Sequence, residues 1–181
     1  MYRELHDLLT DPSHDRGTRL LRLQGWRGDQ LCRATDAGLV ARLAPAFCAL
    51  GGLAVALVGS SALAAAVAVT AAVGVVAANH PVEWVANALA ARGGRVPLPR
   101  NRAAKRLGCA IGTVLLVVAA VAFASGHAVA GAASAGVLAA VAGFVAVTNL
   151  CVPSAIFTVL WGAGRAQAPS LAVLLPGGRR R

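Results

Sequence analysis

The chain has 181 residues, of which 57% are hydrophobic and only 13% are charged, and 17 basic against 7 acidic side chains give a formal net charge of +10. Because a soluble domain has about a quarter charged residues, this chain has too little polar surface to cover a core of its own, which predicts a membrane protein. The composition excludes a disordered tail, a disulfide-stapled miniprotein, and an ordinary nucleic-acid binder, since the basic excess accompanies high hydrophobicity.

Residues 1–38 are the first predicted unit, a cytoplasmic amphipathic segment. Two leucine clusters have the spacing of short helices that would bury these side chains on the membrane face or on a partner protein. The clusters are Leu5, Leu8 and Leu9, and Leu20, Leu21 and Leu23. The alternative is a solvated, salt-bridged lead-in, because seven arginines are interleaved with six acids up to Arg42. The segment has no apolar signal-peptide core, so the first span is expected to direct insertion.

Two stretches without Asp, Glu, Lys or Arg follow, residues 43–82 and residues 107–164. A spanning helix needs about 20 mainly apolar residues, so each stretch is long enough for two crossings, and Gly and Ser near the midpoints predict tight turns. Alanine dominates both stretches, which favours helices over strands. The spans are expected at roughly residues 40–58, 62–79, 107–124 and 132–150, within a transmembrane domain of residues 39–164.

The predicted fold class is therefore all-α, an integral membrane four-helix bundle made of two tandem transmembrane hairpins, each followed by a short interfacial helix. Each hairpin ends in an asparagine and a proline, and an apolar segment with a tryptophan comes next, at residues 82–91 with Trp84 and at residues 155–162 with Trp161. Proline favours a helix start and tryptophan favours the membrane interface. The alternative for the second segment is that Pro153 only kinks the fourth span.

The two halves resemble each other weakly, because an Arg-Leu pair at Arg42 and again at Arg106 is followed by a cysteine and then a glycine. Small residues four apart predict closely packed helices. One such ladder is Ala135, Ala139 and Gly143, and another is Ala62, Ala66, Thr70, Gly74 and Ala78.

The orientation follows from the distribution of charge. Residues 1–42 carry a net +1, residues 83–106 carry +5 and residues 165–181 carry +4, whereas the turns between paired spans carry none. The positive-inside rule then predicts both termini and the basic loop of residues 80–106 in the cytoplasm. Sixteen arginines to one lysine suggest a bacterial inner membrane. The basic cluster is expected to set the topology and attract anionic lipid head groups. Its members are Arg95, Arg100, Arg102, Lys105 and Arg106.

Three cysteines, Cys48, Cys109 and Cys151, fall within about two helical turns of the predicted cytoplasmic interface. A cluster there could be a redox relay or a soft metal site, but a membrane-buried cysteine is more often a small apolar filler. Cys151 begins a C-x-x-S motif that ends at Ser154. Without a second thiol in the motif, Cys151 could attack a partner disulfide but would need Cys109 to recycle.

His80 and Glu83 lie one helical turn apart and are a weak candidate metal pair, with further ligands needed from Cys151 or His6. The more ordinary interpretation is that His80 caps the end of the second span and that Glu83 lies at the N-terminal end of the interfacial helix, where its charge suits the helix dipole. No ionisable residue lies in the middle of a predicted span, which argues against proton pumping, ion-coupled transport and haem ligation. No phosphate-binding loop or nucleophile elbow is present, so no cofactor is expected.

Several motifs together resemble small bacterial integral membrane proteins of the family catalogued as domain of unknown function 4395. They run from His80 to Trp84, from Leu98 through Arg106 to Gly112, and from Thr148 to Ser154. The resemblance covers about residues 36–162 and implies about four spans. Some members look like neighbours of thioredoxin-like or rhodanese-like proteins, which implies thiol or sulfur chemistry, and many have C-x-x-C where this chain has Ser154. The resemblance carries no established activity, so Cys151 corresponds in position only.

The missing catalytic constellation favours a non-enzymatic accessory, assembly or structural subunit of a larger membrane complex, with a membrane-protein partner or a second copy and no nucleic acid. The alternative is a thiol-redox membrane protein that works with a thioredoxin-like partner through Cys151, with Cys109 or Cys48 as the second thiol. Transport, which would need an oligomer to build a pathway, has the least support.

Overall fold

The computed structural model of the chain describes residues 16–36, 38–93 and 97–174, which form nine α-helices, two short 3-10 helices and no β-strand. The all-α prediction is confirmed. The helices are α2 (Arg16–Leu23), α3 (Gly28–Asp36), η1 (Gly38–Arg42), α4 (Leu43–Val58), α5 (Ser61–Val76), α6 (Pro81–Arg92), α7 (Ala103–Ala124), α8 (Ala128–Thr148), α9 (Val152–Trp161), α10 (Ala163–Ala166) and η2 (Leu171–Leu174).

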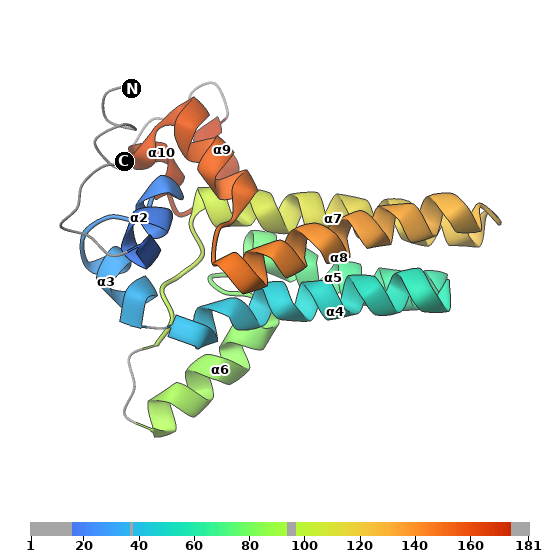
Figure 1. Cartoon of the computed structure of the whole chain (residues 1–181), viewed down its shortest axis with the longest axis horizontal. Coiled ribbons are helices and arrows are strands. Elements are labelled where there is room, and N and C mark those ends of the chain that lie inside the picture. Colours follow the sequence, from blue (N-terminus) through green and yellow to red (C-terminus); the bar gives the residue numbers. More distant parts are fainter. Residues whose placement is uncertain (1–15, 37, 94–96, 175–181) are drawn as a thin grey trace.

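Helices α4, α5, α7 and α8 lie side by side as the four long helices of the molecule (Figure 1). Three continuous segments within the described residues are long and apolar enough to cross a membrane: Val40–Val58, Ala103–Ala124 and Ala128–Thr148. A fourth crossing is possible if α5 and α6, which bend by 66° at their junction, form one broken span. The outward side chains are apolar, since Leu57 is 78% and Val129 is 85% exposed. The chain is therefore a multi-pass membrane protein by length and composition.

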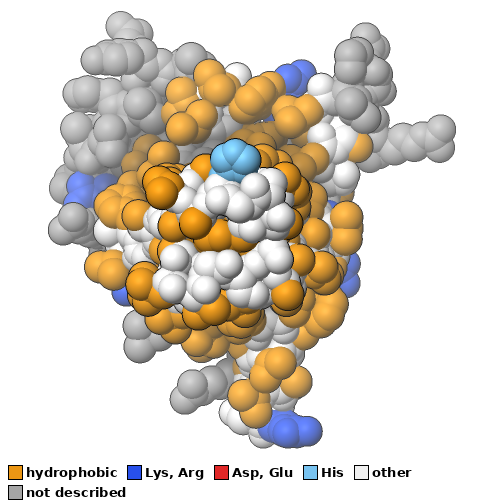
Figure 2. Space-filling view, turned by 90° about the vertical axis from the view of Figure 1, so that its right-hand side faces the viewer, with side chains coloured by type: hydrophobic (Ala, Val, Ile, Leu, Met, Phe, Trp, Pro, Cys, Tyr) orange, Lys and Arg blue, Asp and Glu red, His pale blue; other side chains and the backbone are white. Residues whose placement is uncertain are grey.

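Two tight turns close one end of the long helices. Gly59 ends α4 in the left-handed conformation, and the Ser60 hydroxyl caps α5 by accepting a hydrogen bond from the Leu63 N–H at 3.2 Å. Residues 125–127 join α7 to α8. The end-on view in Figure 2 shows mainly hydrophobic and neutral side chains here, with Lys and Arg only at the margins. This agrees with the charge-free turns expected from the sequence.

Helix α4 packs chiefly against α8, α5 against α7, and α7 against α8, whereas α4 and α5 touch each other less. Helices α4 and α8 approach closely at Gly52, where a Cβ would lie 3.0 Å from the Ala135 carbonyl oxygen and 3.1 Å from the Ala139 nitrogen. The predicted small-residue ladder on α8 is therefore correct, because its residues allow this approach. The core between the four helices is built from Val55, Ala64, Val67, Ala68, Ala71, Leu116, Ala119, Ala135, Leu138 and Ala142.

The predicted ladder on α5 is wrong apart from Gly74. Ala62 and Ala66 are exposed, and the buried face consists of Ala64, Val67, Ala68, Ala71 and Gly74. The physical reason is the helical period: a step of four residues turns by more than one full turn of 3.6, so a ladder of five drifts away from any one face.

The arginines of the two repeated Arg-Leu pairs make equivalent contacts in the structure. Arg42, at the start of α4, donates to the carbonyl of Val147 near the end of α8 at 3.1 Å. Arg106 donates to the carbonyls of Val75 and Val76 at the end of α5, at 2.6 and 3.0 Å. Each arginine thus binds the C-terminal end of the second long helix of the other half, where a positive charge is favourable.

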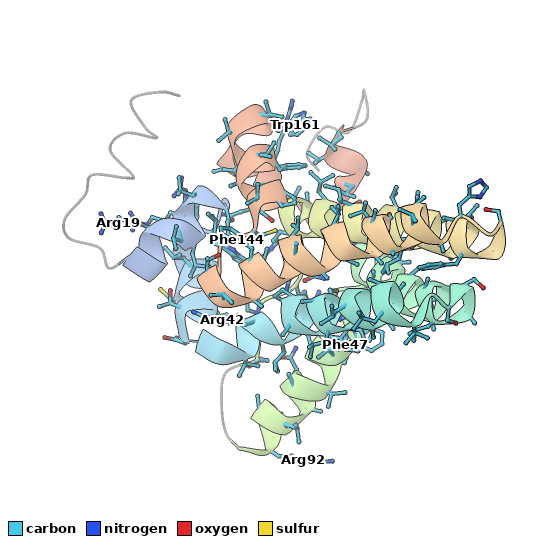
Figure 3. All side chains as sticks on the ribbon, turned by 45° about the vertical axis from the view of Figure 1, so that its right-hand side comes forward. Arg19, Arg42, Phe47, Arg92, Phe144 and Trp161 are labelled. Atoms are coloured by element: carbon cyan, nitrogen blue, oxygen red, sulfur yellow. The ribbon has the colours of Figure 1, made fainter. Side chains whose placement is uncertain are left out.

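Two short helices leave the long helices at the opposite end from the turns. Helix α6 starts at Pro81, and Figure 3 shows Arg92 at its tip. Helix α8 ends at Thr148, where Asn149 adopts a left-handed φ of 59°, and α9 starts at Val152. The helix therefore ends before Pro153, and the alternative of a kinked fourth span is wrong. The third and fourth long helices begin at 103 and 128, four residues before the expected positions.

The amino-terminal helices α2 and α3 lie at this same end, beside α9 and α10 (Figure 1). Leu21, Leu31 and Ala34 form their small core, against which Trp26 packs. Of the two predicted leucine clusters, Leu20, Leu21 and Leu23 lie in α2. The cluster of Leu5, Leu8 and Leu9 lies outside the described residues.

Candidate functional site

A buried ion pair joins α6 to α7. The Lys105 ammonium contacts the carboxylate of Glu83, whose side chain is completely buried, while that of Lys105 is 27% exposed. Glu83 also accepts a hydrogen bond from the His80 N–H at 3.0 Å, and the Nδ1 atom of His80 accepts from the Val82 N–H at 3.4 Å. This is the reciprocal arrangement of a helix capping box. His80 caps the start of α6, and α5 ends separately at Ala77.

Both members of the weak metal pair, His80 and Glu83, are thus engaged in the cap. Within the described part of the chain, no group of three or more His, Cys, Asp or Glu side chains could hold a metal ion. His6 lies outside the described residues. The structure does not bring Cys151 or any further ligand together with His80 and Glu83 as a metal site.

Two buried asparagines fix the segment that leads into α7. Asn101 donates through its side chain to the Gly74 carbonyl at 3.1 Å and through its backbone to the Ala78 carbonyl. Asn79 donates to the Pro99 carbonyl at 3.1 Å. These contacts join residues 20 or more positions apart, and no sequence motif indicates them. They hold the start of α7, and with it Cys109, against the end of α5.

Gly74 lies at the centre of the site. A Cβ at this position would lie 2.9 Å from the Cys109 Sγ and 3.2 Å from the Cδ2 of His80, so only glycine lets both side chains approach. The His80 ring also packs on Phe47, with centroids 5.8 Å apart. His80 is 1% exposed, and its Nε2 atom has no hydrogen-bond partner among the described residues. Buried polar atoms in proteins nearly always have a hydrogen-bond partner, so this ring nitrogen is an exception.

Three of the four cysteines lie on or next to the long helices at this end of the molecule. Cys48 is on α4, Cys109 is on α7, and Cys151 is the residue that precedes α9. The Cys151 Sγ is 3.5 Å from where a Cβ on Gly108 would lie, beside Cys109. All three are half-buried free thiols, while Cys32 is exposed on α3.

Cys151 lies at the start of a helix and next to a hydroxyl donor. It occupies the N-cap of α9, where the helix dipole favours negative charge. The hydroxyl of Ser154, which is 3% exposed, donates to the Cys151 Sγ at 3.1 Å. The C-x-x-S spacing therefore places a hydrogen-bond donor on the sulfur where a C-x-x-C motif would place a second thiol.

One residue at the site carries no sequence signal. The side-chain amide of Gln24 donates to the Asn149 carbonyl at 2.8 Å and accepts from the Cys151 N–H at 3.0 Å. These partners lie about 125 residues further along the chain, so neither spacing nor composition could have indicated the contact.

The basic residues expected to meet lipid divide into two groups. Arg102 donates to the Gln167 carbonyl at 3.0 Å, and Lys105 and Arg106 have the partners given above. Arg100 is exposed, as is Arg92 at the tip of α6. Arg95 lies outside the described residues. Three of the five side chains thus have structural contacts within the chain.

Comparison with known proteins adds one result. None of the curated proteins and none of the solved structures matches the chain. The family model described as "Domain of unknown function (DUF4395)" matches residues 39–161, which include all four long helices, the ion pair and the three clustered cysteines. This match covers two-thirds of the chain, so the chain belongs to the DUF4395 family, as its motifs indicated.

Proposed function

We propose that this membrane protein exchanges disulfides with a thioredoxin-like partner, with Cys151 as the attacking thiol and Cys109 as the second thiol. The observation that carries the proposal is the arrangement of Cys151 at the N-cap of α9, with the Ser154 hydroxyl on its sulfur and Gly108, the residue before Cys109, next to it. A thiolate is the nucleophile in such exchange.

The proposed topology has two transmembrane hairpins, α4 with α5 and α7 with α8. In it, α6 and α9 lie in the membrane interface, and the thiol end faces the cytoplasm of a bacterial inner membrane. The support is the charge distribution, since the segment that connects α6 to α7 is basic and the turns at the other end are neutral. Exposed Arg92 and Arg100 would meet anionic lipid head groups there.

With α6 at the membrane surface, His80 and Glu83 lie outside the spans. Burial alone would raise the pKa of Glu83, but the charge and hydrogen bond of Lys105 outweigh it and hold the pKa below 4.5. Burial lowers the pKa of His80 below 6.5, more than the Glu83 carboxylate raises it. His80 is therefore neutral at pH 7, and because Nδ1 accepts a hydrogen bond, its proton is on Nε2. That N–H has no hydrogen-bond partner among the described residues.

The exchange has two steps. The Cys151 thiolate attacks one sulfur of the partner disulfide, that S–S bond breaks, and the partner's other sulfur leaves as a thiolate. The Cys109 thiolate then attacks the Cys151 Sγ, which forms a Cys109–Cys151 disulfide and releases the partner's first sulfur. The partner gains two electrons and the two protons that Cys109 and Cys151 lose, so the partner is reduced and this chain is oxidised.

Trapping in cells tests the proposal. A thioredoxin-like protein that keeps both of its cysteines, and so can form the disulfide that Cys151 attacks, is coexpressed with wild type, C109S, C151S and C32S, and mixed disulfides are separated on non-reducing gels. C109S is expected to accumulate the mixed disulfide, because the second step is blocked, whereas C151S is expected to lose it. C32S is the matched control and should equal wild type. Trapping that is unchanged in C151S would rule the proposal out.

An accessory or assembly subunit without catalysis is the second candidate. The exposed apolar side chains of α6 and α9 favour it, because they lie outside the packing of the four long helices and could bind a larger complex. They include Trp84, Val85, Leu89, Ile156, Leu160 and Trp161. Purification from native membranes tests this role: constant partners would support it, and a protein that is always alone and monomeric would contradict it.

A further inference from the structure

We propose that Gln24 is a positioning residue that fixes the backbone at Cys151 and so directs its thiol toward Ser154 and Gly108. The inference rests on the disulfide exchange proposed above. It assigns a role in that chemistry to the segment that precedes the transmembrane helices, because Gln24 lies outside the family-matched residues 39–161.

The Gln24 amide binds the backbone on both sides of Leu150. Its Nε2 group donates to the Asn149 carbonyl at 2.8 Å and to the Leu20 carbonyl at 3.0 Å, while its Oε1 atom accepts from the Cys151 N–H at 3.0 Å. The amide orientation is determined by these partners, because a flipped amide would set its NH2 group against the Cys151 N–H donor and its oxygen against the two carbonyl acceptors. Gln24 is 7% exposed, so water competes little for these hydrogen bonds.

The turn that carries Gln24 is itself fixed. Gly25 has a φ of +90°, and a Cβ there would lie 2.6 Å from the Ala166 Cβ and 2.9 Å from the Thr158 Oγ1. Gln167 donates to the Gly25 carbonyl at 2.9 Å. The turn therefore lies directly against α9 and α10, and the Gln24 side chain starts from a defined position.

The backbone that Gln24 binds needs such support. Asn149 has a left-handed φ of 59°, which is uncommon for a residue with a side chain. The Leu150 N–H is bound by the Thr148 hydroxyl at 3.2 Å, which leaves the Asn149 carbonyl and the Cys151 N–H to Gln24. Because the backbone sets the direction of the Cα–Cβ bond, these hydrogen bonds set where the Cys151 Sγ lies.

The test uses two glutamine variants of the full chain in detergent micelles. Q24M keeps the side-chain length and removes all three side-chain hydrogen bonds of Gln24, whereas Q167M is the matched control, because it removes a contact to the same turn without touching Cys151. Two quantities are measured: hydrogen exchange of the Cys151 amide by NMR, and the rate of Cys151 alkylation against pH.

Q24M is expected to speed exchange of the Cys151 amide by about tenfold, the equivalent of one lost hydrogen bond, and to shift the pH profile of Cys151 alkylation. Q167M is expected to leave both within about threefold of wild type. Equal effects in the two variants would show that Gln24 only helps to hold its turn against α9 and α10, and would overturn the proposal. Exchange and alkylation rates in Q24M equal to those of wild type would overturn it as well.

A second variant keeps the test decisive if Q24M does not fold. Q24E retains an acceptor for the Cys151 N–H and lacks the donor for Asn149, so exchange at Cys151 is expected to remain within about threefold of wild type while alkylation changes. Unchanged alkylation in Q24E would overturn the positioning role. If wild type forms no mixed disulfide, the proposed function fails, and the exchange data still decide whether Gln24 holds Cys151.

Discussion

At Gly74, the absence of a side chain allows Cys109 and His80 to meet. The substitution G74A would place a methyl group 2.9 Å from the Cys109 Sγ and 3.2 Å from the His80 ring. We expect it to destabilise the protein by about 1–3 kcal/mol, even though alanine has the higher helix propensity.

The control is G136A, on α8, where a Cβ would meet nothing within 4 Å. This substitution is expected to stabilise the protein by up to about 1 kcal/mol through helix propensity alone. Thermal unfolding in detergent, followed by circular dichroism, measures both variants. Similar shifts of the same sign in G74A and G136A would contradict the packing at Gly74.

The sequence predicts part of this site at residue level. The depth of Cys48, Cys109 and Cys151 along the helices follows from the charge-free stretches, because each cysteine lies within a few residues of a charged or proline boundary. The contacts of Gln24 and Asn101 do not follow from sequence. The residues that make these contacts are 27 and 127 positions apart in the sequence, and no local period or spacing indicates that they meet.

Helices α6 and α7 are joined by the pair of Glu83 and Lys105. K105M would leave a completely buried carboxylate without its cation, at a cost of about 3–5 kcal/mol. The double variant E83Q/K105M removes both charges and is expected to be less destabilised than K105M. A double variant no more stable than K105M would show that charge burial is not the cause.

The same pair predicts a pH dependence. The pKa of Glu83 is lower in the folded protein than its ordinary value of 4.5, so its contribution to stability is complete above that pH and is lost as the pH falls through the folded pKa. The unfolding temperatures of wild type and E83Q are measured from pH 7 to pH 3. The difference between them should stay constant down to pH 4.5 and shrink below it. A difference that grows on acidification would contradict the ion pair.

The long helices could be predicted, because an apolar segment in lipid must satisfy its own backbone hydrogen bonds and an alanine-rich segment does so as a helix. The residues at which the helices begin could not be predicted, and α7 shows the reason. Lys105 and Arg106 seemed to mark the outside of a span, yet the helix begins at Ala103, since both side chains find partners on α5 and α6.

The whole molecule is polar at one end and apolar elsewhere, which gives the topology a direct test. In a background without other cysteines, S60C and H127C lie in the two neutral turns, whereas R100C and the native Cys32 lie at the thiol end. A membrane-impermeant maleimide is expected to label S60C and H127C in intact cells, and R100C and Cys32 only after lysis. The reverse pattern would invert the proposed orientation.

The central claim is that Cys151 and Cys109 form one dithiol. Membranes are equilibrated with an oxidised thioredoxin-like protein, free thiols are alkylated, and the cysteine peptides are mapped by mass spectrometry. A Cys109–Cys151 disulfide is expected in wild type and absent from C151S, with Cys32 alkylated in both. Recovery of Cys109 and Cys151 as alkylated thiols in wild type, with the partner still oxidised, would contradict the account.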